Sequence, residues 1–407
     1  MKRIMYCGLM SFFIFLLIAV SCPLSADPPV KKFATKDGSR PRGLFAPGVM
    51  IGKTFYISGK GDYRPGEPYP EKVRNCLNEV RKVLQVMGMD MENIVKSFCF
   101  LEEPERYPEF NKVYAEFFTN DPPARTTLGV PKVPGDSRIE ITCIAYSDLA
   151  GKKRIGTPPE GFPFSPAILG GNTLYISGKG DHLPDGSHPK TFEEQVRQAM
   201  MNVGNVLEQA SLDFQNIVLS RVYVDNYDNL GIVNKVYSEF FDYGNEPARE
   251  TVFVDWIPGG SHIEITCIAT TDIEGRKVVR PASMKYGPDG SAMSASPAVW
   301  AGDTLYMSSL SGFVPGKGII SGDLAQQTHQ MAENHIDILK EAGLELENIV
   351  SGNVYLRDIK DYKPFNDIYR EYFTKGPGVR TCLMPNSGYE KNDIRTRASF
   401  IAARTKK

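Results

Sequence analysis

Apolar and polar residues follow two different periods along this chain. Short apolar runs rich in β-branched and aromatic residues, such as residues 54–57, predict strands. Between such runs, apolar residues such as Val196 and Met200 recur at helical spacing and predict helices. Thr191 and Glu194 precede this helical pattern with the spacing of a capping box. For the middle of the chain the expected elements are a helix after Thr191, a strand at 217–224, a helix at about 230–241 and strands at 249–254 and 262–269.

This order of elements occurs three times. The segment TFYISGKGD at 54–62 recurs as TLYISGKGD at 173–181 and, less faithfully, as TLYMSSLSG at 304–312. The units are roughly 120–130 residues long, which exceeds solenoid repeats of about 20–50 residues and matches an independent domain. We therefore expect three tandem α+β domains, each a mixed, mostly antiparallel sheet with two helices on one face. The expected bounds are 40–150, 160–274 and 290–405.

The segments between the repeats and before the first repeat differ from the rest. Residues 151–163 and 275–290 are basic, rich in Pro and Gly, and predict domain connections. Residues 1–26 combine a basic start, an apolar run and small residues, as a secretory signal does. Cleavage after Ala26 would release an exported soluble protein, whereas cleavage before Cys22 would leave a lipoprotein. An uncleaved membrane anchor is the third interpretation.

The composition excludes few classes of protein, but it reduces the range of expected binding partners. The 407 residues are 42% hydrophobic and 23% charged, as in ordinary globular proteins, and the net charge is −1. Such a charge offers no electrostatic reason to expect nucleic acid, and it predicts a membrane contact only if Cys22 is lipidated. The five cysteines after the leader form no CxxC spacing and predict buried thiols. The five histidines show no metal-ligand spacing, so we expect no metal and no cofactor.

Paired charges carry the candidate chemistry. Arg125 and Glu140 are fifteen residues apart, as are Arg249 and Glu264. An arginine can hold a carboxylate in a two-pronged contact, and a glutamate can move a proton. The alternative is a buried ion pair that joins two adjacent strands of one repeat. In the third repeat, Arg395 stands fifteen residues after the arginine in place of a glutamate.

Two further features recur in the repeats. A Ser-Gly pair ends the first strand and offers a hydroxyl and an approachable backbone N–H, although it also suits a plain turn. An asparagine recurs inside the second helix, where asparagine is mildly unfavourable, so a packing or site role is expected. The residues concerned are Ser58 and Gly59, Ser177 and Gly178, and Asn111, Asn234 and Asn366.

These motifs together resemble a known family. The succession of Y-I-S-G, V-N-x-x-Y-x-x-F-F, P-A-R and I-E-I-x-x-I-A is similar to the Rid family of reactive-intermediate deaminases, also called the YjgF or endoribonuclease L-PSP family. The resemblance implies a chorismate-mutase-like fold and homotrimers with sites between subunits. It places the carboxylate-binding arginine at Arg125, Arg249 and Arg380, and the catalytic glutamate at Glu140 and Glu264. It adds Thr127, Thr251, Phe45 and Phe164 to the substrate-binding set, alongside the Ser-Gly pairs and the asparagines.

For a chain with three copies, the resemblance implies an intramolecular, monomeric pseudo-trimer whose three sites differ. The implied activity is hydrolysis of 2-aminoacrylate-like enamines and imines to 2-oxo acids and ammonia. The alternative is an exported binder of small carboxylates that uses the same arginines without turnover. A ribonuclease, which the older family name suggests, fits poorly because the charge is near neutral and no His/Lys catalytic cluster is present. Two of the three sites are expected to carry the chemistry.

Overall fold

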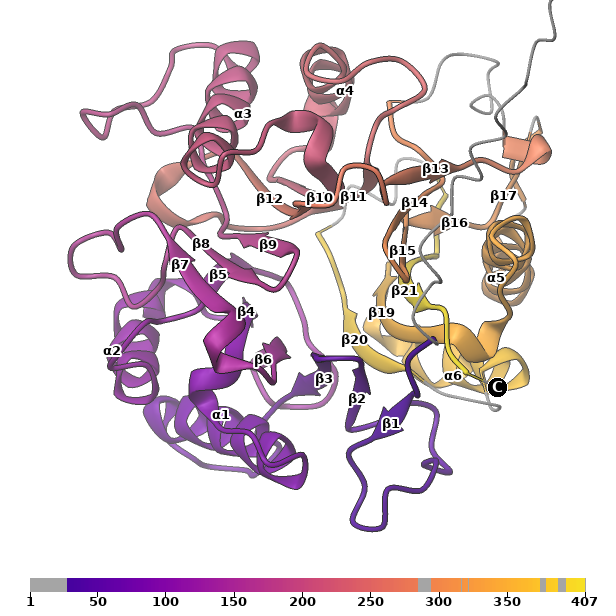
Figure 1. Cartoon of the computed structure of the whole chain (residues 1–407), viewed down its shortest axis with the longest axis horizontal. Coiled ribbons are helices and arrows are strands. Elements are labelled where there is room, and N and C mark those ends of the chain that lie inside the picture. Colours follow the sequence, from indigo (N-terminus) through magenta and orange to yellow (C-terminus); the bar gives the residue numbers. More distant parts are fainter. Residues whose placement is uncertain are drawn as a thin grey trace, which may run out of the picture.

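The computed structural model describes residues 28–406 except 285–293, 316, 321, 374–377 and 387–392, so the expected leader at 1–26 lies outside the described residues. Each repeat contains a mixed sheet and two long helices (Figure 1). The first comprises β1 (Lys32–Phe33), β2 (Gly48–Ile51), β3 (Thr54–Lys60), α1 (Tyr69–Val86), β4 (Ile94–Leu101), α2 (Tyr107–Phe117), β5 (Ala124–Gly129) and β6 (Ile139–Tyr146).

The second repeat follows the same plan, and its helix α3 begins at the predicted capping box. It comprises β7 (Lys152–Ile155), β8 (Ala167–Gly170), β9 (Thr173–Ile176), α3 (Phe192–Gln209), β10 (Ile217–Val224), α4 (Leu230–Ser238), β11 (Ala248–Phe253) and β12 (Ile263–Thr270). Strand β10 has the predicted bounds, whereas α4 ends three residues before the predicted Phe241.

The third repeat adds short strands after its first hairpin. It comprises β13 (Lys277–Val279), β14 (Ala298–Ala301), β15 (Thr304–Met307), β16 (Leu310–Ser311), β17 (Phe313–Val314), β18 (Gly318–Ile319), α5 (Leu324–Glu341), β19 (Ile349–Leu356), α6 (Tyr362–Tyr372), β20 (Val379–Leu383) and β21 (Thr396–Ala403).

The three sheets share one strand order. In the first it is β1-β2-β3-β6-β4-β5, in the second β7-β8-β9-β12-β10-β11 read from the other edge, and in the third β13-β14-β15-β21-β19-β20. One pair in each is parallel (β4/β5, β10/β11 and β19/β20), and the other pairs are antiparallel. The predicted mixed, mostly antiparallel sheet is confirmed. The predicted connections at 151–163 and 275–290 are not plain linkers, because each supplies an edge strand, β7 or β13, to the next sheet.

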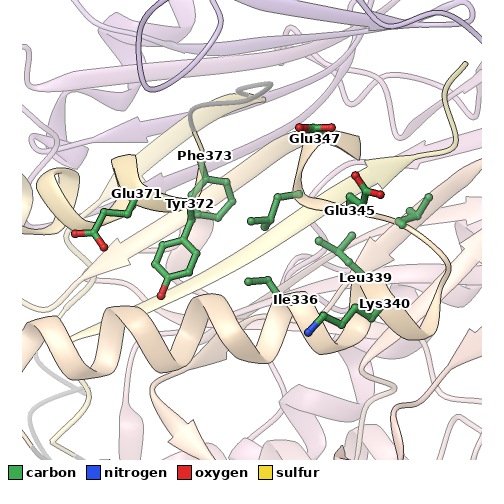
Figure 2. A pocket seen from close by; sticks show the side chains of 10 residues that line it. Ile336, Leu339, Lys340, Glu345, Glu347, Glu371, Tyr372 and Phe373 are labelled. Carbon is green, nitrogen blue, oxygen red and sulfur yellow. The ribbon is translucent and has the colours of Figure 1, made fainter. Parts of the chain in front are cut away.

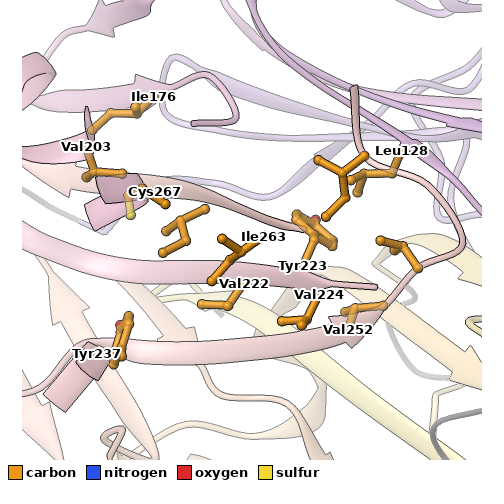
Figure 3. Close-up of a cluster of buried hydrophobic side chains, with 14 of the residues drawn as sticks. Leu128, Ile176, Val203, Val222, Tyr223, Val224, Tyr237, Val252, Ile263 and Cys267 are labelled. Carbon is orange, nitrogen blue, oxygen red and sulfur yellow. The ribbon is translucent and has the colours of Figure 1, made fainter. Parts of the chain in front are cut away.

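Alternating strand residues divide each sheet between two cores. On β3, Phe55 and Ile57 join the core beneath α1 and α2, while Tyr56 points to the opposite face. Figure 3 shows the corresponding helix-side core of the second repeat, which Leu128 of the first repeat also enters. Tyr56, Tyr175 and Tyr306 occupy equivalent positions in the three repeats and lie in one buried cluster formed from all three sheets. The repeats therefore contact one another through the sheet faces that the helices leave open.

Two smaller points complete the fold. Cys76, Cys99, Cys143, Cys267 and Cys382 are free and buried, as predicted. Of the helices in the described residues, none is long and apolar enough to cross a lipid bilayer.

Candidate functional site

The arginine and glutamate of one repeat do not meet. Arg125 lies on β5 and Glu140 on β6, and β4 runs between these two strands. Opposite them on β4, Ser97 pairs with Arg125 and Phe100 with Glu140, so the two are also offset along the strands. The alternative of an ion pair between adjacent strands is therefore wrong. Each arginine instead faces the glutamate position of the next repeat.

Three equivalent hydrogen bonds define these contacts. The backbone N–H of Arg125 donates to Ser177 Oγ at 2.8 Å, that of Arg249 to Ser308 Oγ at 2.8 Å, and that of Arg380 to Ser58 Oγ at 3.0 Å. We call the three places the 1–2, 2–3 and 3–1 sites after the repeats that form them. Each serine hydroxyl also donates to a backbone carbonyl twelve residues earlier. The serines expected to contact substrate thus hold neighbouring repeats together.

At the 1–2 site, aromatic rings and one amide orient Arg125. Its Nη2 donates to Asn111 Oδ1 at 2.7 Å and to Tyr107 Oη at 2.9 Å. The rings of Tyr114 and Phe164 lie 4.7 and 5.0 Å from the guanidinium carbon, within range for a cation–π contact. The side chain is buried, and its Nη1 has no hydrogen-bond partner among the described residues. A buried donor without a partner is costly, so this atom is set up to bind an anion.

Glu264 on β12 supplies the other half of the 1–2 site. It is buried at 6% exposure, and its Oε1 has no hydrogen-bond partner among the described residues. The carboxylate rests on Gly178, where a Cβ atom would overlap Oε1. Burial raises the pKa of Glu264 to about 7, against the opposing effect of Lys96, Lys179 and Arg125. A carboxyl group with such a pKa can both give and take a proton near neutral pH.

A cavity joins the two groups. This cavity has a volume of about 1190 Å³, and Arg125, Glu264, Asn111 and Phe164 all line it; a second cavity, of about 370 Å³, lies elsewhere. Thr127 and the backbone of Gly178 also face the larger cavity. The smaller cavity, shown in Figure 2, lies on the third repeat between α5, the 3-10 turn Leu346–Asn348 and the end of α6, and includes no residue of the three sites.

The 3–1 site repeats the arginine, asparagine, phenylalanine and glutamate of the 1–2 site. Arg380 on β20 donates from Nη1 to Asn366 Oδ1 at 2.8 Å, and the Phe45 ring lies 5.0 Å from its guanidinium carbon. Glu140 is buried here, and a Cβ on Gly59 would overlap its Oε1. Burial raises the pKa of Glu140 to about 8, opposed by the backbone N–H of Cys382 and by Arg380. Arg380 therefore pairs with the glutamate of the first repeat.

At the 2–3 site, no glutamate among the described residues stands opposite the arginine. Arg249 donates to Asn234 Oδ1 at 2.7 Å, but Arg397 occupies the position of the glutamate. The register shows this, because Tyr223 pairs with Glu264 and its counterpart Tyr355 pairs with Arg397. The expectation that Arg395 stands there is wrong, since the glutamate position follows the arginine by seventeen residues in the third repeat and by fifteen in the other two. Arg395 forms an ion pair with Asp361 at 2.7 Å instead.

Sequence reasoning missed several site residues. Tyr107 and Tyr362 each lie four residues before the site asparagine of their helix and accept hydrogen bonds from Arg125 and Arg380. Their one-turn spacing from the asparagine was the available signal. Lys96 is a buried amine that donates across the 1–2 contact to Ile176 O at 2.8 Å and Thr266 Oγ1 at 2.8 Å. Nothing in its sequence context indicated burial.

Comparison with known proteins agrees with this architecture. The family model described as endoribonuclease L-PSP matches residues 36–147, 157–271 and 290–384. A RutC family protein of Saccharolobus solfataricus is 33% identical over 117 residues, covering 27% of this chain and 93% of the relative. The 2-iminobutanoate/2-iminopropanoate deaminase of Rattus norvegicus is 37% identical over 108 residues, covering 26% of this chain and 78% of that protein. A solved structure of a Rid-family protein from Yersinia pestis is 35% identical and covers 30% of this chain and 99% of its own, with a TM-score of 0.28.

Proposed function

This chain belongs to the endoribonuclease L-PSP (Rid) family, in three tandem copies, and on that premise we propose that it is a deaminase of 2-imino acids. One observation carries the proposal. At the 1–2 site, Arg125 Nη1 and Glu264 Oε1 are both buried, both lack a hydrogen-bond partner among the described residues, and both belong to residues that line one cavity. A substrate that carries a carboxylate next to an imine carbon can bind Arg125 through the carboxylate and present the imine carbon to a water molecule at Glu264.

The chemistry needs only these groups and water. An enamine such as 2-aminoacrylate takes up a proton at carbon and becomes the 2-imino acid, whose carboxylate binds Arg125. Glu264 accepts a proton from a water molecule as the water oxygen attacks the imine carbon. The same carboxyl group returns the proton to the nitrogen of the carbinolamine. The Glu264 carboxylate then takes the hydroxyl proton as the carbon–nitrogen bond breaks, which releases ammonia and leaves the 2-oxo acid.

Two sites are proposed to catalyse this reaction. The 1–2 site uses Arg125 and Glu264, and the 3–1 site uses Arg380 and Glu140, so every active pair is drawn from two repeats. The expected assignment of Arg249 to catalysis changes, because Arg397 rather than a glutamate stands opposite Arg249. Asn111 and Asn366 orient the arginines, and Phe164 and Phe45 cover them.

The test is hydrolysis of 2-iminopropanoate generated in the assay by an amino-acid oxidase. The double variants Arg125→Ala/Arg380→Ala and Glu140→Gln/Glu264→Gln should lose at least about 100-fold in kcat/KM. Arg197→Ala and Glu239→Gln, which break an exposed ion pair between α3 and the residue after α4, serve as matched controls and should retain the rate. Wild-type rates in both double variants would overturn the proposal.

The pH profile adds a second test. In Arg380→Ala only the 1–2 site remains, and its base must be ionised to accept a proton from water. Because burial raises the pKa of Glu264 to about 7, kcat/KM should rise with pH through that value. A profile that is flat between pH 5 and 9 would contradict the role of Glu264.

The 2–3 site favours a second function, binding without turnover. Burial lowers the pKa of the Arg249 guanidinium, and the positive charge of Arg397 lowers it further, so an anion between them would relieve both. We propose that this site holds a small carboxylate and hydrolyses nothing. Calorimetric titration of Glu140→Gln/Glu264→Gln with pyruvate should show binding that Arg249→Ala reduces. Unchanged binding in that triple variant would rule out the 2–3 site as a binder.

A further inference from the structure

A buried aspartate in the second repeat has lost the partners that its counterpart in the first repeat keeps. Asp181 and Asp62 end the same segment, Ser-Gly-Lys-Gly-Asp. Asp62 accepts hydrogen bonds from Arg64 Nε at 2.8 Å, Arg64 Nη2 at 3.1 Å and Asn75 Nδ2 at 3.0 Å. These three donors neutralise and solvate a carboxylate that is only 5% exposed.

In the second repeat these donors are gone. Leu183 takes the position of Arg64, and Gln198 takes that of Asn75 but donates to Asn202 at 2.9 Å. Asp181 is nevertheless fully buried, and neither of its oxygens has a hydrogen-bond partner among the described residues. A buried carboxylate in this state destabilises the fold unless a cation offsets its charge.

Two imidazoles take the place of the lost donors. His188 Nδ1 lies 3.2 Å from Asp181 Oδ1, and the His182 and His188 rings lie 4.4 Å apart. One ligand atom from each of Asp181, His182 and His188 lies within 4.8 Å of the other two. This cluster could not be predicted from the sequence, because the two histidines are six residues apart in a loop and match no zinc motif.

The outer contacts of both histidines suit metal ligands. His182 Nε2 lies 3.2 Å and His188 Nε2 lies 3.1 Å from the backbone oxygen of Gly259. Metal-binding histidines commonly donate one ring N–H to a carbonyl in this way, which leaves the other nitrogen as a lone-pair donor; in His182 this nitrogen lies 3.4 Å from Ser261 Oγ, a long contact that a metal ion would replace. Gly259 has φ 73°, and a Cβ there would lie 2.6 Å from His182 Nε2, so the turn Pro258–Gly260 can approach the rings only with glycine.

The distance between the inner atoms also fits an ion. With both Nε2 atoms protonated, His188 Nδ1 and Asp181 Oδ1 would direct lone pairs at each other at 3.2 Å. Two ligands of one tetrahedral zinc ion, each about 2.0–2.2 Å from the metal, are roughly 3.3 Å apart. Nδ1 of His188 is buried and has no hydrogen-bond partner among the described residues.

We propose that Asp181, His182 and His188 form a site for a divalent transition-metal ion of the zinc class. Two imidazoles and one carboxylate suit Zn²⁺, Ni²⁺ or Cu²⁺ better than Mg²⁺ or Ca²⁺, which prefer oxygen ligands. The ion would tie the loop that carries His182 and His188 to the turn Pro258–Gly260. His182 and Gly259 also line the cavity of the 1–2 site, so the ion would stiffen one wall of that cavity.

The test is metal binding by the full chain without a histidine tag, stripped with a chelator and titrated with Zn²⁺ against a chromophoric chelator. We expect one tight equivalent, which His188→Gln and His182→Gln each weaken at least about tenfold. His262→Gln is the matched control, because His262 forms an exposed pair with Asp225 at 2.6 Å and should leave binding unchanged.

Three outcomes are decisive. Co²⁺ bound in place of Zn²⁺ should give the visible absorption of a four-coordinate site in the wild type and lose it in His188→Gln, which supports the proposal. No binding by the wild type overturns it and leaves a His188–Asp181 ion pair in its place. Binding that survives both histidine substitutions also overturns it, since the ion then lies elsewhere. Because no substrate is used, the result is independent of the imine-hydrolysis assay.

Discussion

At the scale of single residues, the glycine of the Ser-Gly pair and the glutamate depend on each other. Gly178 lets the Glu264 carboxylate rest on its Cα, and any side chain there would overlap it. In the third repeat the equivalent position is Ser309, and the residue opposite is Arg397, which donates to Ser309 O at 3.2 Å. The repeat that lacks the glutamate therefore also lacks the need for glycine. The replacement of glycine by serine and the replacement of glutamate by arginine are therefore linked, because both concern the same close contact.

This coupling predicts the effect of Gly178→Ala. The added methyl group should push the Glu264 carboxylate out of place, lower the rate of the 1–2 site at least about tenfold and cost roughly 1–3 kcal/mol of stability. Imine hydrolysis in the Arg380→Ala background and urea unfolding measure the two effects. Gly231→Ala on α4, where a Cβ meets nothing within 4 Å, is the control and should be neutral or slightly stabilising. Equal behaviour of the two variants would contradict the steric argument.

Glu140 predicts a pH-dependent stability. Burial raises its pKa from the usual 4.5 to about 8, so between these values the folded protein binds more protons than the unfolded chain. Stability therefore falls as the pH rises across this window. Glu140→Gln cannot ionise, and relative to wild type it should gain roughly 2–5 kcal/mol between pH 4 and pH 9. Urea unfolding at both pH values measures the difference, and a parallel pH dependence in wild type and variant would contradict it.

At the scale of elements, local sequence signals located the helices and strands well. The capping box at Thr191 and the β-branched run at 217–224 coincide with the start of α3 and with β10. Both signals act within a few residues, so these elements can be predicted without knowledge of the tertiary contacts. The pairing of the strands, in contrast, could not be predicted from local signals. Strand β10 inserts between β11 and β12, which are neighbours in sequence, and this insertion separates the arginine from the glutamate of its own repeat.

The capping box gives an element-scale prediction. Glu194 N–H donates to Thr191 Oγ1 at 3.3 Å, and Thr191 N–H donates to Glu194 Oε2 at 3.1 Å. Thr191→Ala removes the first of these bonds and should cost about 1 kcal/mol in urea unfolding. Thr191→Ser keeps the hydroxyl and should stay close to wild type. A Thr191→Ser variant as unstable as Thr191→Ala would show that packing of the methyl group matters more than the cap.

At the scale of the whole molecule, two of the three contacts between repeats contain a buried charged group of their own. Lys96 of the first repeat reaches Thr266 of the second at the 1–2 contact. At the 2–3 contact, Glu250 of the second repeat accepts hydrogen bonds from Tyr355 and Ser399 of the third. A repeat placed at the wrong contact would leave such a group buried without its partners. These groups can therefore set which repeats meet.

Glu250→Gln tests this role. Glu250 is fully buried and forms an ion pair with Arg221, whose Nε lies 3.3 Å away. The neutral amide would leave the buried Arg221 charge without its counter-ion, and we expect a loss of roughly 3–5 kcal/mol in urea unfolding. Glu239→Gln, in an exposed ion pair, should change stability by no more than about 0.5 kcal/mol. A similarly small effect of Glu250→Gln would show that the buried Glu250 carboxylate does not hold the second and third repeats together.

A pseudo-trimer within one chain predicts a monomer. If the three repeats bury one another's sheet faces, no further copies are needed to complete the sites. Sedimentation equilibrium should then give a mass no greater than the 45.2 kDa of a single chain. A stable trimer of chains, with three times that mass, would contradict the prediction.

The three repeats, the order of the elements and the residue types of the site can all be read from the sequence. These features follow from local patterns or from patterns that recur along the chain, and they include the arginines, the asparagines and the two glutamates. Which of these residues act together depends on the tertiary contacts. The strand order of the sheet separates Arg125 from Glu140. The contact between the first and second repeats places Arg125 at the same site as Glu264, which lies 139 residues further along the chain. The position of Arg397 and the Asp181 cluster also could not be predicted from the sequence. Strand register and loop packing depend on contacts between distant residues, and such contacts leave no periodic pattern in the sequence.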